Sequence, residues 1–322
     1  MPRPDPARAM AAAPAAPLPT RDGVGPSCIA LPTQTPQAWP TITDFLAQRF
    51  PAIARDEWLA RMRRGEVVDA QGARIAPGDA CRPGTKLYYY RSLPEEPRIP
   101  FEATVLYRDE HLLAVDKPHF LPVTPAGKYL QETLLVRLRR QLGIDTLAPV
   151  HRIDRETAGL VLFSLLPATR GLYHALFRRH AVAKQYEAIA RWRADLALPL
   201  VIKSRIAEGA SFMQMREAPP AEGPPNAETT LTLLEVRGAL ARYRLQPVTG
   251  QRHQLRVQMA ALGLPILNDG IYPRHLPEPA AGSAPDYGKP LLLLARSLAF
   301  TDPVSGRPLC LESRRTLPFP DG

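Results

Sequence analysis

Strand-like runs follow one another along most of this 322-residue chain, without a long helix between each pair. Short apolar runs with an alternation of period two, such as those at residues 184–192 and 229–236, predict half-buried strands. A doubly wound parallel sheet needs a crossover, usually a helix, between successive strands, and the sequence does not supply that regular alternation. We therefore predict an α+β fold, built on a mixed, largely antiparallel sheet with flanking helices.

Four segments of the chain differ in composition. Residues 1–40 are rich in alanine and proline and lack the basic start and apolar stretch of a signal peptide, so we expect a disordered tail. Residues 41–92 contain two short helical patterns followed by strand-like runs, which predicts a small α/β module. Residues 93–100 are rich in proline and glutamate, which predicts a linker. The large α+β domain then covers residues 101–318.

The charge of the chain favours a polyanionic partner. The net charge is +10, from 41 basic minus 31 acidic residues, and only six of the basic residues are lysines. The positive charge is therefore almost all arginine, which binds phosphate bidentately and stacks on bases, as RNA requires. A compositional bias of the source organism would give the same excess of arginine, so composition alone leaves both explanations open.

The cysteines and histidines indicate neither disulfides nor a metal site. Cys28, Cys81 and Cys310 lie far apart and form no Cys-x-x-Cys pair, and the seven histidines show no metal-ligand spacing. We expect a cytoplasmic protein without a bound metal. No run approaches the roughly 18 apolar residues of a membrane helix, so no membrane association is expected. Nothing in the sequence demands more than a monomer.

One carboxylate stands between two arginines in the segment His-Arg-Ile-Asp-Arg-Glu-Thr-Ala-Gly-Leu-Val at residues 151–161. Asp154 lies where a loop leads into an apolar strand, with Arg152 and Arg155 beside it. Nearby guanidinium groups favour the ionised form of a carboxylate, and an ionised, oriented carboxylate is a candidate nucleophile. A surface salt-bridge cluster at the start of a strand explains the same residues equally well. This segment alone leaves both interpretations open.

Three further stretches contain residues that could carry chemistry. Residues 116–118 read Asp-Lys-Pro, a strand end whose usual meaning is a rigid turn. Tyr186 lies in the middle of a predicted strand, where a half-buried packing role is the commoner one. Arg252 and Arg256 are four residues apart and share one face of a predicted helix. Such an arginine can reach into a cleft, or lie along the surface with its stem packed.

Together these stretches resemble the RluA-type family of RNA pseudouridine synthases. The segment at 151–160 is similar to the signature His-Arg-Leu-Asp-Arg-x-Thr-Ser-Gly-Leu. Four other motifs of that family are matched in order between about residues 100 and 318: Asn/Asp-Lys-Pro at 116–118, Lys-x-Tyr at 184–186, Thr-Gly-Arg-x-His-Gln-Ile-Arg-x at 249–257 and Gly-His-Pro-Ile-x-Gly-Asp at 263–269. Residues 293–300 fit the closing strand. Residues 41–90 more loosely resemble a small RNA-binding domain, shared with a ribosomal protein, that often precedes this catalytic domain.

The resemblance implies an isomerase that detaches uracil from C1′ of its ribose and rejoins it through C5, without cofactor or metal. It implies that Asp154 is the catalytic aspartate, that Tyr186 stacks on the target base, and that Arg256 pairs with Asp154. Substrate contacts are implied for four further residues, namely Arg152, Arg252, His253 and Leu293.

The resemblance also frames the choice of substrate. We expect a uridine of 23S ribosomal RNA, so that the protein would act in ribosomal RNA processing. A transfer RNA substrate is the nearer alternative, and an RNA-binding or assembly factor without catalysis is an alternative from another class. The complete set of Asp154, Tyr186 and Arg256 argues against that last one. A few positions depart from the family pattern: Ala158 replaces serine, Gln251 replaces arginine, and Leu264 and Leu294 replace histidine.

Overall fold

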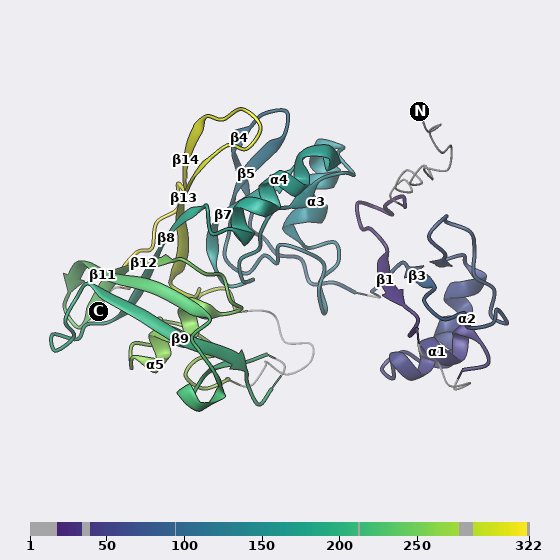
Figure 1. The fold of residues 1–322 in the computed structure, drawn as a ribbon, viewed down its shortest axis with the longest axis horizontal. Coiled ribbons are helices and arrows are strands. Elements are labelled where there is room, and N and C mark those ends of the chain that lie inside the picture. Colours follow the sequence, from purple (N-terminus) through teal and green to yellow (C-terminus); the bar gives the residue numbers. More distant parts are fainter. Residues whose placement is uncertain (1–17, 34–38, 94, 212, 277–285, 321–322) are drawn as a thin grey trace, which may run out of the picture. The chain divides into compact units, whose positions relative to one another are not determined.

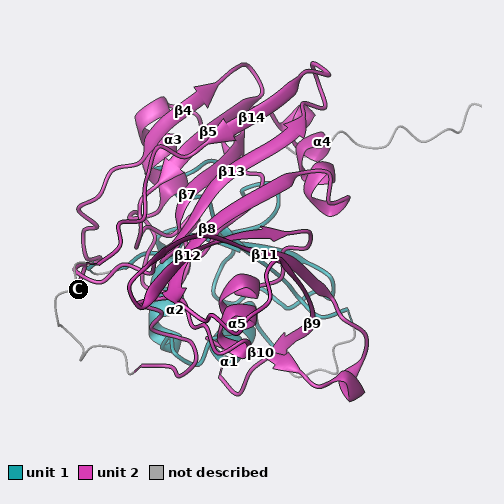
Figure 2. Cartoon of the chain, turned by 90° about the vertical axis from the view of Figure 1, so that its left-hand side faces the viewer, with its two compact units in different colours: residues 1–95 teal, residues 96–322 magenta. Residues whose placement is uncertain are grey.

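The computed structural model describes residues 18–33, 39–93, 95–211, 213–276 and 286–320. The chain divides into two compact units, residues 1–95 and residues 96–322, which are coloured separately in Figure 2. The division falls inside the segment 93–100 that the sequence predicts as a linker. All the residues singled out for chemistry belong to the second unit.

The first unit joins two short helices to a three-stranded antiparallel sheet (Figure 1). Helix α1 begins after Thr41, whose side chain and that of Asp44 bind each other's backbone N–H in a capping box. The helices bury Leu46 and Trp58 against the sheet residue Leu87. The elements are α1 (Ile42–Arg49), α2 (Arg55–Arg63), β1 (Ser27–Ala30), β2 (Val67–Val68) and β3 (Lys86–Tyr89), with the sheet order β1-β3-β2.

The prediction of a disordered tail over residues 1–40 is wrong for residues 27–30. These residues form β1, which pairs with β3 from Ser27 opposite Tyr89 to Ala30 opposite Lys86. A four-residue strand has almost no periodic signal, and its partner lies far along the chain, so local pattern could not reveal it. Residues 1–17 and 34–38 of the predicted tail lie outside the described residues.

The second unit is built on an eleven-stranded sheet (Figure 1). Its order is β10-β9-β11-β12-β8-β13-β7-β5-β4, with β14 on β13 and β6 on β7. Every described pairing in this sheet is antiparallel except that of β13 with β7. The prediction of a mixed, largely antiparallel sheet is confirmed. The strands are β4 (Thr104–Arg108), β5 (Leu112–Lys117), β6 (Ala148–Pro149), β7 (Ala158–Ser164), β8 (Ala183–Arg191), β9 (Leu200–Glu208), β10 (Met215–Ala218), β11 (Ala227–Arg237), β12 (Leu240–Pro247), β13 (Leu293–Thr301) and β14 (Pro308–Glu312).

Helices flank this sheet. Helix α4 (Pro167–Arg178) packs against β7, and α5 (Gln254–Ala261) lies against β9 and β10, as Figure 2 shows for α5. Helix α3 (Leu134–Leu142) packs Leu134 and Leu138 into the same apolar cluster as β5 and β7. A short 3-10 turn covers Pro220–Glu222. Within the described ranges, no helix combines the length and apolar character needed to cross a bilayer.

The only described parallel pairing brings the candidate residues together. Gly159 at the start of β7 lies opposite Ala295 of β13, and Ala295 also lies opposite Tyr186 of β8. Gly159 has φ 108°, and a Cβ there would overlap the backbone carbonyl of Ala295. Only glycine allows so close an approach. The loop before β7, which carries Asp154, therefore lies next to the strands that carry Tyr186 and Leu293.

Candidate active site

Buried polar groups hold the loop that carries Asp154. The Nζ of Lys117, at the end of β5, donates to the carbonyl oxygens of Pro118 at 2.9 Å and Arg155 at 3.0 Å. Nε2 of His151 accepts from the backbone N–H of Leu162 at 3.1 Å. Burial lowers the pKa of His151 to about 3, so its ring stays neutral and able to accept this bond. These contacts tie the loop to β5 and β7, and they give structural roles to His151 and Lys117.

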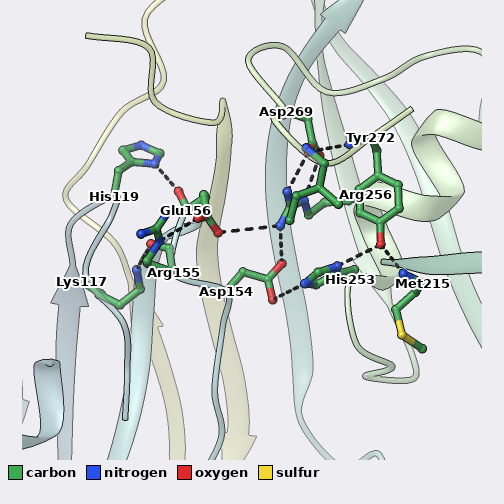
Figure 3. A network of polar contacts seen from close by, with 11 residues as sticks. Lys117, His119, Asp154, Arg155, Glu156, Met215, His253, Arg256, Asp269 and Tyr272 are labelled. Atoms are coloured by element: carbon green, nitrogen blue, oxygen red, sulfur yellow. Dashed lines mark hydrogen bonds and ion pairs between the residues drawn. The ribbon is translucent and has the colours of Figure 1, made fainter. Parts of the chain in front are cut away.

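Arg256 is the cation that contacts Asp154. Its Nη1 lies 3.2 Å from Asp154 Oδ2, although the two residues are distant in the sequence. The other side of the guanidinium binds Asp269 bidentately, with Nε to Oδ2 at 2.8 Å and Nη2 to Oδ1 at 2.7 Å (Figure 3). The side chains of Arg256 and Asp269 are each 1% exposed. Backbone N–H groups of Ile271 and Tyr272 also donate to Asp269 Oδ1, which completes the support beneath Arg256.

The charges around Arg256 keep it protonated in spite of its burial. Burial alone would lower its pKa, but the hydrogen bonds and ion pair with Asp269, followed by the charges of Asp154 and Glu156, outweigh burial and raise that pKa. Arg256 is therefore a permanent positive charge beside Asp154. A guanidinium already bound on one side by a carboxylate has little freedom to move, so it also orients Asp154.

The arginine next to Asp154 in the sequence has a different partner. Arg155 binds Glu156 Oε1 at 2.8 Å and the hydroxyl of Tyr129 at 3.1 Å. Arg155 adjoins Asp154 in the sequence, but among the described contacts its side chain makes no ion pair with Asp154. Arg152 is exposed and lines the pocket described below.

His253 faces the second oxygen of the Asp154 carboxylate. It caps α5 in the left-handed conformation, with φ 54°, and its Nε2 lies 3.9 Å from Asp154 Oδ1. Its Nδ1 is 2.9 Å from the hydroxyl of Tyr272 (Figure 3). Burial lowers the pKa of His253, and this effect outweighs the opposing attraction of the Asp154 carboxylate. His253 is thus a neutral side chain at neutral pH.

A pocket of about 770 Å³ opens over Asp154. Tyr186 and Leu293 line it together with Asp154, as do Arg152 and Arg252. Among the described residues that line the pocket, Asp154 is the only carboxylate, and it stands among six arginines and lysines. Burial, with a smaller contribution from the charge of Asp154, raises the pKa of Tyr186, so its hydroxyl keeps its proton. A pocket with this lining can hold a flat, uncharged ring that is attached to a polyanionic chain.

Positions that depart from the family pattern have structural contacts. Gln251 is exposed; its side chain donates to the carbonyl of Asn226 at 3.2 Å, and its backbone N–H donates to Gln254 at 3.0 Å. Leu264 and Leu294 are fully buried in apolar clusters, where they act as packing residues. In the described part of the chain, no group of three His, Cys, Asp or Glu side chains is arranged to hold a metal ion.

Two residues beside the pocket, Asp269 and Tyr272, could not be assigned a role from the sequence. Asp269 belongs to the matched segment 263–269, so the motif signalled it, but no role could be assigned without the contact to Arg256. Tyr272 lies beyond that motif and carried no signal at all. Asn268, which precedes Asp269, has φ 64° in the left-handed region that asparagine tolerates. This turn directs Asp269 toward Arg256.

Comparisons with known proteins agree with one another. The family model described as RNA pseudouridylate synthase matches residues 111–261. An uncharacterized RNA pseudouridine synthase of Synechocystis is 32% identical over 232 residues, which are 71% of this chain and 78% of that protein. The dual-specificity RNA pseudouridine synthase RluA of Escherichia coli is 33% identical over 221 residues, 68% of this chain and 94% of that protein. The solved structure of human RNA pseudouridylate synthase domain containing 1 has the same fold, with a TM-score of 0.53 at 23% identity over 68% of this chain and 86% of that one.

Proposed function

The chain belongs to the RNA pseudouridine synthase family and is an isomerase, and on this premise we propose that it converts a uridine of large-subunit ribosomal RNA with Asp154 as its catalytic aspartate. One observation carries the proposal. Asp154 is the only carboxylate among the described residues that line a pocket otherwise rich in arginine, and a buried arginine binds it. A pocket of this kind accepts an RNA backbone at its rim and presents one anionic group to the nucleotide inside.

The base has to leave its stack before it can react. Extruding a nucleotide costs a few kcal/mol, and stacking on an aromatic side chain offsets part of that cost. We assign this stacking to Tyr186, which lines the pocket beside Asp154, and the apolar floor under the base to Leu293. Arg152, exposed at the same pocket, would contact the nucleotide or its phosphate.

Asp154 then acts on the nucleoside held above it. The isomerisation breaks the bond between N1 and C1′, forms a bond between C5 and C1′, moves a proton away from C5 and leaves one on N1. Arg256 binds the carboxylate and orients it toward the nucleoside, because its own position is held by Asp269. No step needs a group beyond the side chains of this chain and the RNA.

We prefer ribosomal RNA as the substrate because residues 41–90 loosely resemble a small RNA-binding domain that is shared with a ribosomal protein. One relative is the mitochondrial tRNA pseudouridine(32) synthase of Saccharomyces cerevisiae, so transfer RNA is the class to compare with ribosomal RNA. Pseudouridine should be mapped across total RNA from cells with and without this protein. Loss of one or a few ribosomal positions, restored by the wild-type gene and not by Asp154→Asn, is expected. Loss confined to transfer RNA would replace the proposed substrate, and an unchanged map would refute the function proposed for these cells.

A further inference from the structure

Tyr272 lies in the segment of the chain that connects α5 to β13, and its hydroxyl contacts two groups with different hydrogen-bonding capacity. Tyr272 is 6% exposed. Its hydroxyl oxygen accepts the backbone N–H of Met215 at 2.7 Å and lies 2.9 Å from Nδ1 of His253 (Figure 3). Both distances are within the normal range of hydrogen bonds.

The first contact favours one direction for the second, because the opposite direction would leave the buried hydroxyl proton of Tyr272 without an acceptor among the described contacts. A backbone N–H can only donate, so Met215 occupies one lone pair of the Tyr272 oxygen. The hydroxyl proton then remains to be donated, and Nδ1 of His253 is its acceptor among the described contacts. An Nδ1 that accepts carries no proton. Neutral His253 therefore carries its proton on Nε2, because a neutral imidazole has one protonated nitrogen.

Nε2 is the atom of His253 that faces Asp154. It lies 3.9 Å from Oδ1, while Oδ2 is bound by Arg256 at 3.2 Å. A separation of 3.9 Å is longer than a hydrogen bond, but catalytic contacts commonly shorten when the substrate is bound. The two carboxylate oxygens thus face two different donors: a cation on one side and a neutral N–H on the other.

Tyr272 also supports the cationic donor. Its ring packs against the guanidinium of Arg256, with 5.4 Å from Cζ to the ring centre. Its backbone N–H donates to Asp269 Oδ1 at 3.0 Å, and Asp269 in turn binds Arg256. One residue therefore contacts the supports of both groups that face Asp154.

We propose that Tyr272 is a positioning residue for the isomerisation, whose hydroxyl holds His253 in the tautomer that presents Nε2–H to Asp154 Oδ1. This inference rests on the proposed role of Asp154. A neutral donor orients the carboxylate without forming a second ion pair, so the negative charge stays available to the nucleoside. The groups whose charges act on His253 are Asp154, Arg256, Arg252 and Glu156; burial outweighs them and keeps the ring neutral.

Nitrogen-15 NMR of full-length protein labelled at histidine reads the tautomer directly. Wild-type His253 is expected to carry its proton on Nε2. In Tyr272→Phe, which keeps the ring and loses the hydroxyl, we expect Nδ1–H to become populated and the pKa of His253 to rise. The single-turnover rate on an RNA that the wild type modifies should fall about tenfold, which corresponds to the free energy of one hydrogen bond, while RNA binding is retained.

Tyr243→Phe is the matched control, since that buried hydroxyl donates to the carbonyl of Arg191 at 2.9 Å, away from His253. It should change neither the tautomer nor the rate. An Nδ1–H tautomer in the wild type, or Tyr272→Phe with the wild-type rate and pH profile, would overturn the inference. If Tyr272→Phe does not fold, His253→Gln, whose amide N–H can replace Nε2–H, should be faster than His253→Leu, and equal rates would overturn it. Since the NMR result is independent of turnover, an inactive wild-type protein would contradict the proposed function alone.

Discussion

Replacing Asp269 by asparagine removes the negative charge that holds Arg256 beneath the pocket. Asp269 receives two guanidinium N–H bonds, at 2.8 and 2.7 Å, and both side chains are 1% exposed. The asparagine oxygen can still accept from Arg256 Nη2 and from the backbone of Ile271 and Tyr272. Its amide group would then face Arg256 Nε–H, donor against donor. The variant therefore tests the negative charge of this side chain and the direction of its hydrogen bonds to Arg256, with almost no change in shape.

The size of the effect follows from what remains around Arg256. Leaving an uncompensated charge after breaking a buried ion pair costs about 3–5 kcal/mol. Asp154 at 3.2 Å and Glu156 at 3.9 Å still compensate part of the charge, and one hydrogen bond survives. We therefore expect the lower end, about 3 kcal/mol of local stability. Arg256 should also move toward Asp154, and a misplacement of about 1 Å can cost about a hundredfold in rate.

Hydrogen exchange measures this cost where it arises, because a chain of two units need not unfold in one step. Amide protection in α5, which carries Arg256, should fall about a hundredfold, since each 1.4 kcal/mol is about a factor of ten. Asp302→Asn is the control: Asp302 is also buried, but it binds the hydroxyl of Tyr173. That variant should keep the α5 protection and the rate of the wild type. Unchanged α5 protection and activity in Asp269→Asn would show that Asp269 does not hold Arg256 in place.

Three further predictions concern RNA binding, packing and pH. Arg152→Ala should reduce the slope of log affinity for RNA against log salt concentration by about 0.7, the value for one phosphate contact on a single strand. Arg216→Ala, which breaks an exposed ion pair with Glu222, should leave that slope unchanged. Gly159→Ala should destabilise the chain by about 3 kcal/mol or more, because φ is 108° and the added Cβ meets the backbone of β13. Gly171→Ala is the control: its added Cβ lies in open space within α4, so it should stabilise the chain by up to about 1 kcal/mol. Burial lowers the pKa of Lys117 to about 7, although the charges of Glu156 and Asp154 act in the opposite direction. Between pH 7 and 10.5 the lysine of the unfolded chain therefore holds a proton that the folded chain has lost. The free energy of unfolding should rise with pH over this range. Denaturation midpoints of Lys117→Met should show a smaller rise over that range than the wild type; an equal rise would mean that another group titrates.

The strands could be predicted from local pattern because alternation and apolar runs record which face is buried. Residues 184–192, for example, place Tyr186 on the face that packs into the cluster around Leu293, as β8 does in the structure. Strand β1 could not be found in this way. It contributes four residues, and its stability comes from pairing with the distant β3.

The site was predictable only where a motif carried it. Asp154, Tyr186 and Arg256 stand in three separate motifs, and the structure places all three at one pocket. Tyr272 acts through the contact of its hydroxyl with His253, which no spacing in the sequence encodes. Arg155 shows the opposite case: it is adjacent to Asp154 in the chain, yet its side chain binds Glu156. Adjacency in sequence was a poor guide to ion pairing because successive side chains of a loop point in different directions.

Single-turnover conversion of uridine by Asp154→Asn tests whether the Asp154 carboxylate is required for the isomerisation. Asparagine keeps the shape of the side chain and removes the charge that Arg256 binds at 3.2 Å. The variant should form no pseudouridine in an RNA that the wild type modifies, while binding that RNA with similar affinity. Asp195→Asn, at an exposed pair with Arg193, should remain fully active. Conversion by Asp154→Asn at the wild-type rate would mean that this carboxylate does not carry the chemistry.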